Sequence, residues 1–343
     1  MSLSGLLPVI SADSELRQVL DQAAELPALG GDLIAPPSLR PLLVAALAGA
    51  GGPAGAPATE STGAGGFVLA VTATARESED LAAALGSLLG EDQVGYFPAW
   101  ETLPHERLSP RSDTSGQRLA VLRRLAHPDS SDPRSGPLQV VTTPVRSLLQ
   151  PMVSGLGELA PVKLVAGQEA SLSDTVAQLI GIGYARVDMV ERRGELAVRG
   201  GLLDVFPPTE EHPLRVEFWG DDVEEIRYFK AADQRSLANA DDGLWAPPCR
   251  ELLLTPAVRD RARQLAAEWP GLHDILGKMA EGITVEGMEA LAPALTDRME
   301  LLLDHLPRGA KIIACDPERI RARAADLVWT SQEFLEASWV NAA

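Results

Sequence analysis

The sequence predicts an α/β protein, and three observations along the chain support this class. Before about Pro151, short apolar strands alternate with amphipathic helices, a pattern typical of a parallel sheet. From Leu159 to Arg227 the strands are short, alternating and separated by turns, which favours a small α+β domain with an antiparallel sheet. After about Ala246, helical patterns return.

The first part of the chain supplies the predicted parallel sheet. Apolar residues from Leu16 to Ala23 recur at helical spacing, and aliphatic runs predict strands. In order, we expect a helix at 11–28, a strand at 67–71, a helix at 77–89, a strand at 94–97, a helix at 118–125 and a strand at 138–142. Segments 48–66 and 127–137 are rich in small and polar residues, so we expect loops there.

The later part of the chain is predicted to contain one helix within the small domain and several helices beyond it. The first covers 172–182 and stops before Gly183, a residue type common after helix ends. The later elements are helices at 256–269, 285–291 and 317–340, and a buried strand at 311–315.

Two strands between Arg193 and Asp222 have an unusual outer face. Side chains alternate along a strand, so the aliphatic residues of these strands share one face. They are Leu196, Val198, Leu214, Val216 and Phe218. With that face toward the core, Arg199, Arg215 and Trp219 point to solvent, and these residue types are enriched at the energetic centres of protein interfaces. Alternatively, the arginines of this region are spread over a solvated sheet and paired with its carboxylates.

The charge and aromatic content disfavour nucleic acid as a direct partner. The formal net charge is −18 at pH 7, which argues against a surface devoted to neutralising DNA phosphates. The chain has only three tyrosines and no aromatic-dense segment on which bases could stack. A DNA-binding role is therefore disfavoured.

Composition also indicates the compartment. The chain has no run of 18 apolar residues, and its N-terminus lacks the basic start and apolar core of a signal peptide. We expect a cytoplasmic protein that does not enter a membrane. Cys249 and Cys315 lack metal-ligand spacing and are predicted to be buried, reduced thiols, with no metal site.

Several motifs between Val94 and Ser236 occur together in one order. R-G-E-L-A-V-R-G-G-L-L-D-V-F-P-P and P-L-R-V-E-F-W-G-D follow one another, flanked by Y-A-R-V-D and D-Q-R-S. They resemble the region shared by the excision-repair protein UvrB and the bacterial transcription-repair coupling factors. F-P-A-W-E-T-L-P-H-E, then Ser109-Pro110 and a helix with R-L-A-V-L from Arg118, is similar to the coupling factors in particular. Several independent motifs make this resemblance specific.

The resemblance implies a fold. UvrB-like proteins contain a helicase-like, P-loop-type α/β domain, here degenerate, that is split in sequence by a small α+β domain with an antiparallel sheet. We therefore expect residues 1–151 to form the first part of the α/β domain and residues 152–246 the inserted UvrA-binding domain. Residues 247–343 would form the second part and a connecting helix. The family's proteins are longer, so we expect this chain to be an N-terminal part that lacks the ATP-dependent translocase domains.

The resemblance also implies a partner. Coupling factors use this region to mimic UvrB and recruit UvrA to stalled RNA polymerase, while RNA polymerase and double-stranded DNA bind regions absent here. Arg199 and Arg215 match the family's UvrA-contacting arginines, and Trp219 takes the position of an aromatic contact that is usually Phe. Guanidinium groups suit this role because they grip carboxylates at two points. We expect alanine at either arginine to weaken binding without unfolding the protein.

A nucleotide site is the main alternative, since UvrB-like domains are related to helicases. A P-loop needs glycines and a lysine, but the first lysine is Lys163, and segment 30–40 contains two prolines instead. The acidic pair that would hold magnesium is interrupted by Pro317, which instead predicts that Asp316 caps a helix. We expect no cofactor and no catalysis. A degenerate nucleotide- or DNA-binding module of an excision-repair helicase remains the alternative.

Overall fold

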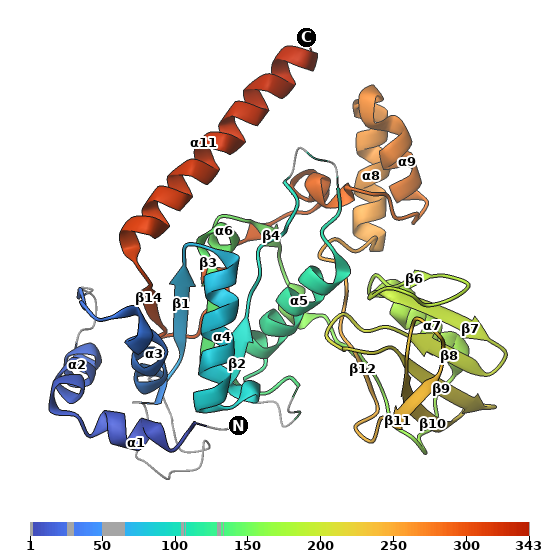
Figure 1. The fold of residues 1–343 in the computed structure, drawn as a ribbon. Helices are drawn as coiled ribbons and strands as arrows, with labels where there is room; N and C mark the ends of the chain where they lie inside the picture. Colours follow the sequence, from blue (N-terminus) through green and yellow to red (C-terminus); the bar gives the residue numbers. More distant parts are fainter. Residues whose placement is uncertain are drawn as a thin grey trace. The chain divides into compact units, whose positions relative to one another are not determined.

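The structure is a computed structural model that describes residues 3–25, 31–49, 66–103, 106, 108–128, 132 and 134–342. It is mixed α/β, with a parallel sheet and separate antiparallel sheets, which confirms the predicted fold class (Figure 1). The chain forms two compact units. The first contains Met1–Ala99, Arg124–Pro151 and Leu301–Ala343, and the second contains Trp100–Arg123 and Met152–Glu300.

Each unit combines segments that are distant in the sequence. Residues 247–300, expected in the second part of the α/β domain, group with the second unit. The limits 1–151, 152–246 and 247–343 therefore stay a prediction.

Four parallel strands form the sheet of the first unit, in the order β14-β1-β3-β2. Their bounds are β1 Val68–Thr72, β2 Val94–Tyr96, β3 Val140–Pro144 and β14 Lys311–Ala314. The central strands β1 and β3 are buried along their whole length, as expected where both faces of a parallel sheet are covered. The predicted full burial of 311–315 is wrong, because β14 is an edge strand and Ile312 is 56% exposed.

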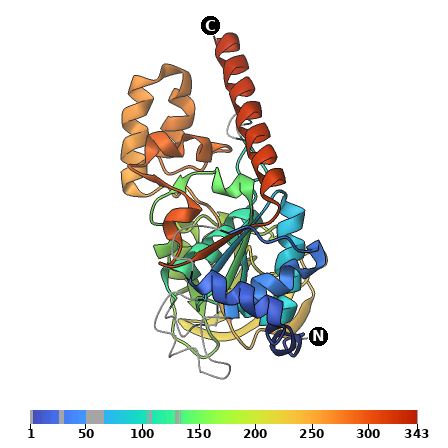
Figure 2. The ribbon, with the colours of Figure 1, turned by 90° about the vertical axis from the view of Figure 1, so that its left-hand side faces the viewer.

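Helix α4 (Ala75–Leu89) packs against this sheet (Figure 1). Its Thr74 hydroxyl accepts a hydrogen bond from the Glu77 amide at 3.3 Å, a typical N-cap. The remaining helices of this unit are α1 (Leu6–Ser11), α2 (Ser14–Glu25), α3 (Arg40–Gly49), α6 (Val145–Leu148) and α11 (Pro317–Ala342), with short 3-10 turns at Pro37–Leu39, Glu91–Gln93 and Leu302–His305. Aliphatic residues of α3, α4, β1 and β3 form one core. Figure 2 shows α11 following β14 and extending away from the sheet.

A six-stranded sheet dominates the second unit, in the order β11-β10-β9-β8-β7-β6. Its strands are β6 Ala185–Arg186, β7 Glu195–Arg199, β8 Leu202–Val205, β9 Leu214–Trp219, β10 Asp222–Phe229 and β11 Ser236–Asn239. Neighbouring strands are antiparallel except β6 and β7. This arrangement fits the predicted antiparallel sheet.

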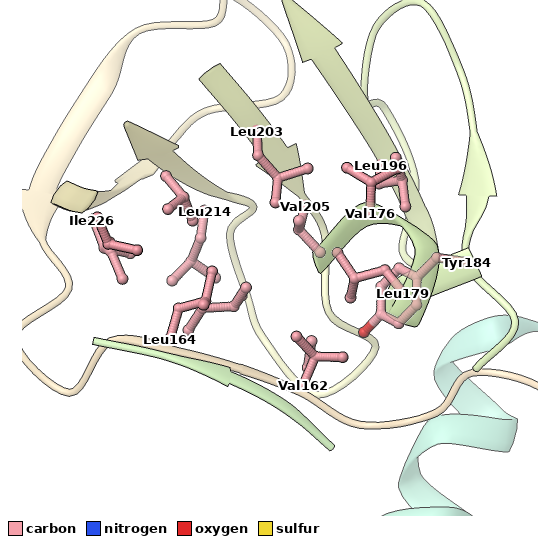
Figure 3. Packing of buried hydrophobic residues seen from close by; sticks show 14 of the residues in the cluster. Val162, Leu164, Val176, Leu179, Tyr184, Leu196, Leu203, Val205, Leu214 and Ile226 are labelled. Carbon is pink, nitrogen blue, oxygen red and sulfur yellow. The ribbon is translucent and has the colours of Figure 1, made fainter. Parts of the chain in front are cut away.

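One face of this sheet is covered by helix α7 (Leu172–Gly181) and by the pair β5 (Val162–Leu164) and β12 (Leu244–Ala246). Figure 3 shows the aliphatic residues of the strands meeting Leu179 and Val176 of α7 in this core. Leu196, Leu214, Val216 and Phe218 are all buried here, as the alternation predicts.

The rest of the second unit is largely helical. It contains the beginning of α5 (Ser112–Ala126), α8 (Pro256–Glu268), α9 (His273–Ala280) and α10 (Ala292–Leu295), with short 3-10 turns at Leu156–Glu158, Pro270–Leu272 and Met288–Leu291 and a short pair β4 (Met152–Val153) and β13 (Met299–Glu300). The helix predicted at 285–291 is only the turn Met288–Leu291, because Gly287 has a left-handed backbone. Apolar residues of α8, α9 and α10 form their own core.

Candidate functional site

The candidate interface is the face of the six-stranded sheet that turns away from the α7 core. Residues directly opposite each other on neighbouring antiparallel strands share a face. Arg199 lies opposite Leu202, and Leu202 lies opposite Glu217. Since Arg215, Glu217 and Trp219 alternate on β9, the register places Arg199, Arg215 and Trp219 on the same face.

Exposure separates these three residues. Trp219 is 77% exposed at the end of β9, and Arg199 is exposed at the end of β7. The side chain of Arg215 is only 15% exposed. The expectation that all three point into solvent is therefore wrong for Arg215.

Arg215 is covered because it forms a bidentate ion pair with Asp204 on the neighbouring strand β8. Arg215 lies directly opposite Asp204, with Nε 2.6 Å from Oδ1 and Nη2 2.7 Å from Oδ2. The Asp204 side chain is 5% exposed. The guanidinium carbon also lies 4.6 Å from the centre of the Phe229 ring. The hydrogen bonds that Arg215 donates to Asp204 raise the pKa of Arg215 above its usual value.

A second, smaller core explains why this part of the face is covered. Phe229, Phe206, Ala197 and Val190 are buried together there. Sequence reasoning treated the face as solvated and missed this core. The signal was present, because Ala197 and Phe229 are apolar residues at positions that alternate with the α7-facing set.

The alternative interpretation, in which arginines pair with local carboxylates, is confirmed for part of the sheet. Arg227 lies 3.0 Å from Glu217 and 2.9 Å from Glu225, both partly exposed, and Arg215 pairs with Asp204. Arg199 differs, because its Nη2 donates to a backbone oxygen, that of Asp188, at 2.8 Å. Arg199 and Trp219 are therefore the exposed residues of the candidate interface, while Arg215 is largely covered.

The structure describes most of the two segments considered for a nucleotide site. Gly30 lies outside the described residues, and 31–36 contains no strand before the 3-10 turn at Pro37. Asp316 has a φ of 69°, and its Oδ1 accepts from the Arg319 amide at 3.4 Å, while α11 begins at Pro317. The predicted helix cap is confirmed.

The described residues contain neither a candidate metal site nor a candidate membrane span. No group of three or more His, Cys, Asp or Glu residues in the described part of the chain is placed to hold a metal ion. No described helix combines the length and apolar character needed to cross a bilayer. Both cysteines are free and buried, as predicted.

The segment that contains the six-stranded sheet indicates the class of protein. Residues 162–247, which contain this sheet, match the family model of the UvrB interaction domain. The chain is also 30% identical over 130 residues to the UvrABC system protein B of Bacillus cereus, covering 36% of this chain and 20% of that protein. This part of the chain is therefore similar to UvrB.

The particular family follows from longer matches. Over 351 residues the chain is 50% identical to the transcription-repair-coupling factor of Mycobacterium tuberculosis, covering 99% of this chain and 27% of the relative. It is 31% identical over 262 residues to the same factor of Myxococcus xanthus, covering 72% of the chain and 21% of the relative. The chain belongs to the transcription-repair-coupling factors and corresponds to their N-terminal, UvrB-homologous region. It spans only about a quarter of the length of these relatives.

Proposed function

We propose that this chain is a non-catalytic interaction module that recruits UvrA in transcription-coupled nucleotide excision repair. The observation that carries the proposal is the 77% exposure of Trp219, on the open face of a sheet within the segment that matches the UvrB interaction domain. For binding of RNA polymerase and double-stranded DNA, and for ATP-driven movement, we propose regions of the longer relatives that this chain does not match.

The exposed residues suit a protein partner. A tryptophan in solvent loses little conformational freedom when it is buried by a partner, and it supplies a large apolar contact area. Arg199 stands on the same face and can donate charge-assisted hydrogen bonds to carboxylates. We therefore infer that UvrA presents an apolar pocket with acidic groups nearby. Arg215 supports this face more than it contacts the partner, because Asp204 already occupies two of its donor groups.

Calorimetric titration of UvrA with single variants tests the proposal. Trp219→Ala is expected to weaken binding by about 2 kcal/mol or more, and Arg199→Ala by about 1–3 kcal/mol, as at interface hot spots. Trp329→Ala is the matched control, since Trp329 is 65% exposed on α11 in the other unit. Equal affinities for all three variants and the unmodified chain would reject this face as the UvrA site.

A further inference from the structure

The D-Q-R-S motif contains Gln234, a residue with a strained backbone to which the proposed function assigns no role. Gln234 has a φ of 60°, and among the described residues only Asp316 shares a positive φ without being glycine. This left-handed conformation is unfavourable for a long side chain, and it persists where surrounding contacts hold it. Residues with such a strained backbone are often found at ligand-binding sites and in switch regions.

The contacts of Gln234 connect it to residues of the candidate interface. Its backbone amide donates to the Lys230 oxygen at 2.8 Å, within the turn that joins β10 and β11. Its side-chain Nε2 donates to the oxygens of Ala231 at 2.9 Å and Val190 at 3.4 Å. Its Oε1 accepts from Arg215 Nη2 at 3.4 Å. One side-chain amide therefore joins the turn, the arginine and the segment before β7.

That segment is also held by the second arginine of the site. Arg199 donates to the oxygen of Asp188, and Gln234 donates to the oxygen of Val190, two residues further on. Met189, between these two anchor points, is 42% exposed. Both arginines are connected to the segment 188–190, Arg199 directly and Arg215 through Gln234.

We propose that Gln234 is a positioning residue for UvrA binding. This inference rests on the proposed function. Gln234 holds segment 188–190 against the covered part of the sheet face, so that Arg199 and Met189 are presented to UvrA in a fixed arrangement. Without the amide, the segment and Arg199 must be ordered during binding, which lowers affinity through lost preorganisation.

Two substitutions remove the amide contacts in different ways. Gln234→Asn keeps an amide and a residue type that tolerates positive φ, but its side chain is one methylene shorter. Gln234→Gly removes the side chain and also relieves the backbone strain. For both we expect UvrA affinity to fall about fivefold to tenfold, the range of one lost net hydrogen bond. The melting temperature of the Gln234→Gly variant should equal that of the unmodified chain or exceed it. Hydrogen exchange should accelerate at amides 188–192.

Two controls separate positioning from a general structural effect. Asp316→Gly changes the other strained residue, in the other unit, and is expected to leave UvrA affinity unchanged. In a double-mutant cycle, Gln234→Asn combined with Arg199→Ala should weaken binding by less than the product of the two single effects, because both act through segment 188–190.

The outcomes distinguish this inference from the proposed function. Wild-type affinity in both Gln234 variants, while Trp219→Ala and Arg199→Ala weaken binding, would overturn the positioning role and leave the UvrA site in place. The positioning role would also be overturned if the affinity losses of Gln234→Asn and Arg199→Ala were additive in the double variant. The same holds if the Gln234 variants lose affinity only together with a lowered melting temperature. If the unmodified chain does not bind UvrA, the proposed function fails and this inference fails with it.

Discussion

Arg118 and Glu251 lie 133 residues apart in the sequence and form a two-point ion pair inside the second unit. Nε is 2.6 Å from Oε1 and Nη2 is 3.3 Å from Oε2, and the side chains are 0% and 2% exposed. Trp100 Nε1 donates to the same Oε1 at 2.8 Å. Trp100 is half-buried, and this hydrogen bond joins it to a residue 151 positions further along the chain.

Breaking this pair should strongly destabilise the chain. Glu251→Ala leaves the Arg118 charge buried without its carboxylate, and we expect a loss of about 3–5 kcal/mol in the free energy of unfolding. Denaturant unfolding measures this loss. Asp260→Ala is the control, because the Arg263–Asp260 pair is 62% and 68% exposed and should contribute less than about 1 kcal/mol. Similar losses for the two variants would contradict the buried pair.

Arg215 and Arg199 should behave differently although both are candidate UvrA-contacting residues. The sequence alone leads to the expectation that neither alanine variant unfolds the protein. Since Arg215 neutralises the buried Asp204 carboxylate, we now expect Arg215→Ala to destabilise the chain by about 3–5 kcal/mol. Arg199→Ala should change stability by no more than about 0.5 kcal/mol. Thermal unfolding of both variants checks this, and equal stabilities would be inconsistent with the structure.

At Gly116, intrinsic helix propensity favours alanine, whereas tertiary packing favours glycine. In an isolated helix, alanine at this position of α5 would stabilise by about 0.5–1 kcal/mol relative to glycine. In the structure, a Cβ at Gly116 would lie 2.2 Å from Pro208 Cγ. We expect Gly116→Ala to destabilise by about 1–3 kcal/mol, as in an overpacked core. Gly277→Ala in α9 is the control and should stabilise, because no atom beyond its chain neighbours and the nearby backbone of α9 lies within 4 Å of the added Cβ. Denaturant midpoints of both variants decide the sign.

The two thiols should be unreactive until the chain unfolds. Burial raises the pKa of Cys249 to about 12 and that of Cys315 to about 11. The thiolate is the nucleophile, so a thiol reagent at pH 8 should modify neither residue in the native protein and both after denaturation. The thiol pKa is about 8.5 in an unfolded chain, so unfolding becomes easier as the pH rises above that value toward the folded pKa values. Rapid labelling of the native chain would contradict this burial.

The chain is expected neither to bind ATP tightly nor to hydrolyse it. The segment before α3 has no lysine, and Asp316 caps α11 instead of standing beside a second acidic residue. Titration with a fluorescent ATP analogue in the presence of magnesium should show no saturable binding. Magnesium-dependent turnover that co-purifies with the chain and is lost in an Asp316→Ala variant would overturn this prediction.

Local patterns accounted for much of the fold. The strands at β1, β2 and β3 and the helices α4, α7 and α8 lie close to their predicted positions, because each carries its own periodicity and its own end signals. The helix expected at 285–291 does not form in full, because Gly287 has a left-handed backbone. The spacing of apolar residues does not reveal such a backbone conformation. The exposure of β14 could not be predicted, since a strand's place at the edge of a sheet depends on its neighbours.

The sequence by itself determined which residues of β7 and β9 face the core and which face away, because alternation along a strand is a property of the backbone. It also placed Arg199, Arg215 and Trp219 on one face. Only the tertiary structure decided which of them reach solvent. Asp204, Phe229 and Gln234 come from other strands and turns, and their approach to Arg215 depends on strand register and on the covering segment before β7. Pairing between residues distant in sequence is set by how the whole sheet packs, so a pattern of neighbours along the chain cannot reveal it.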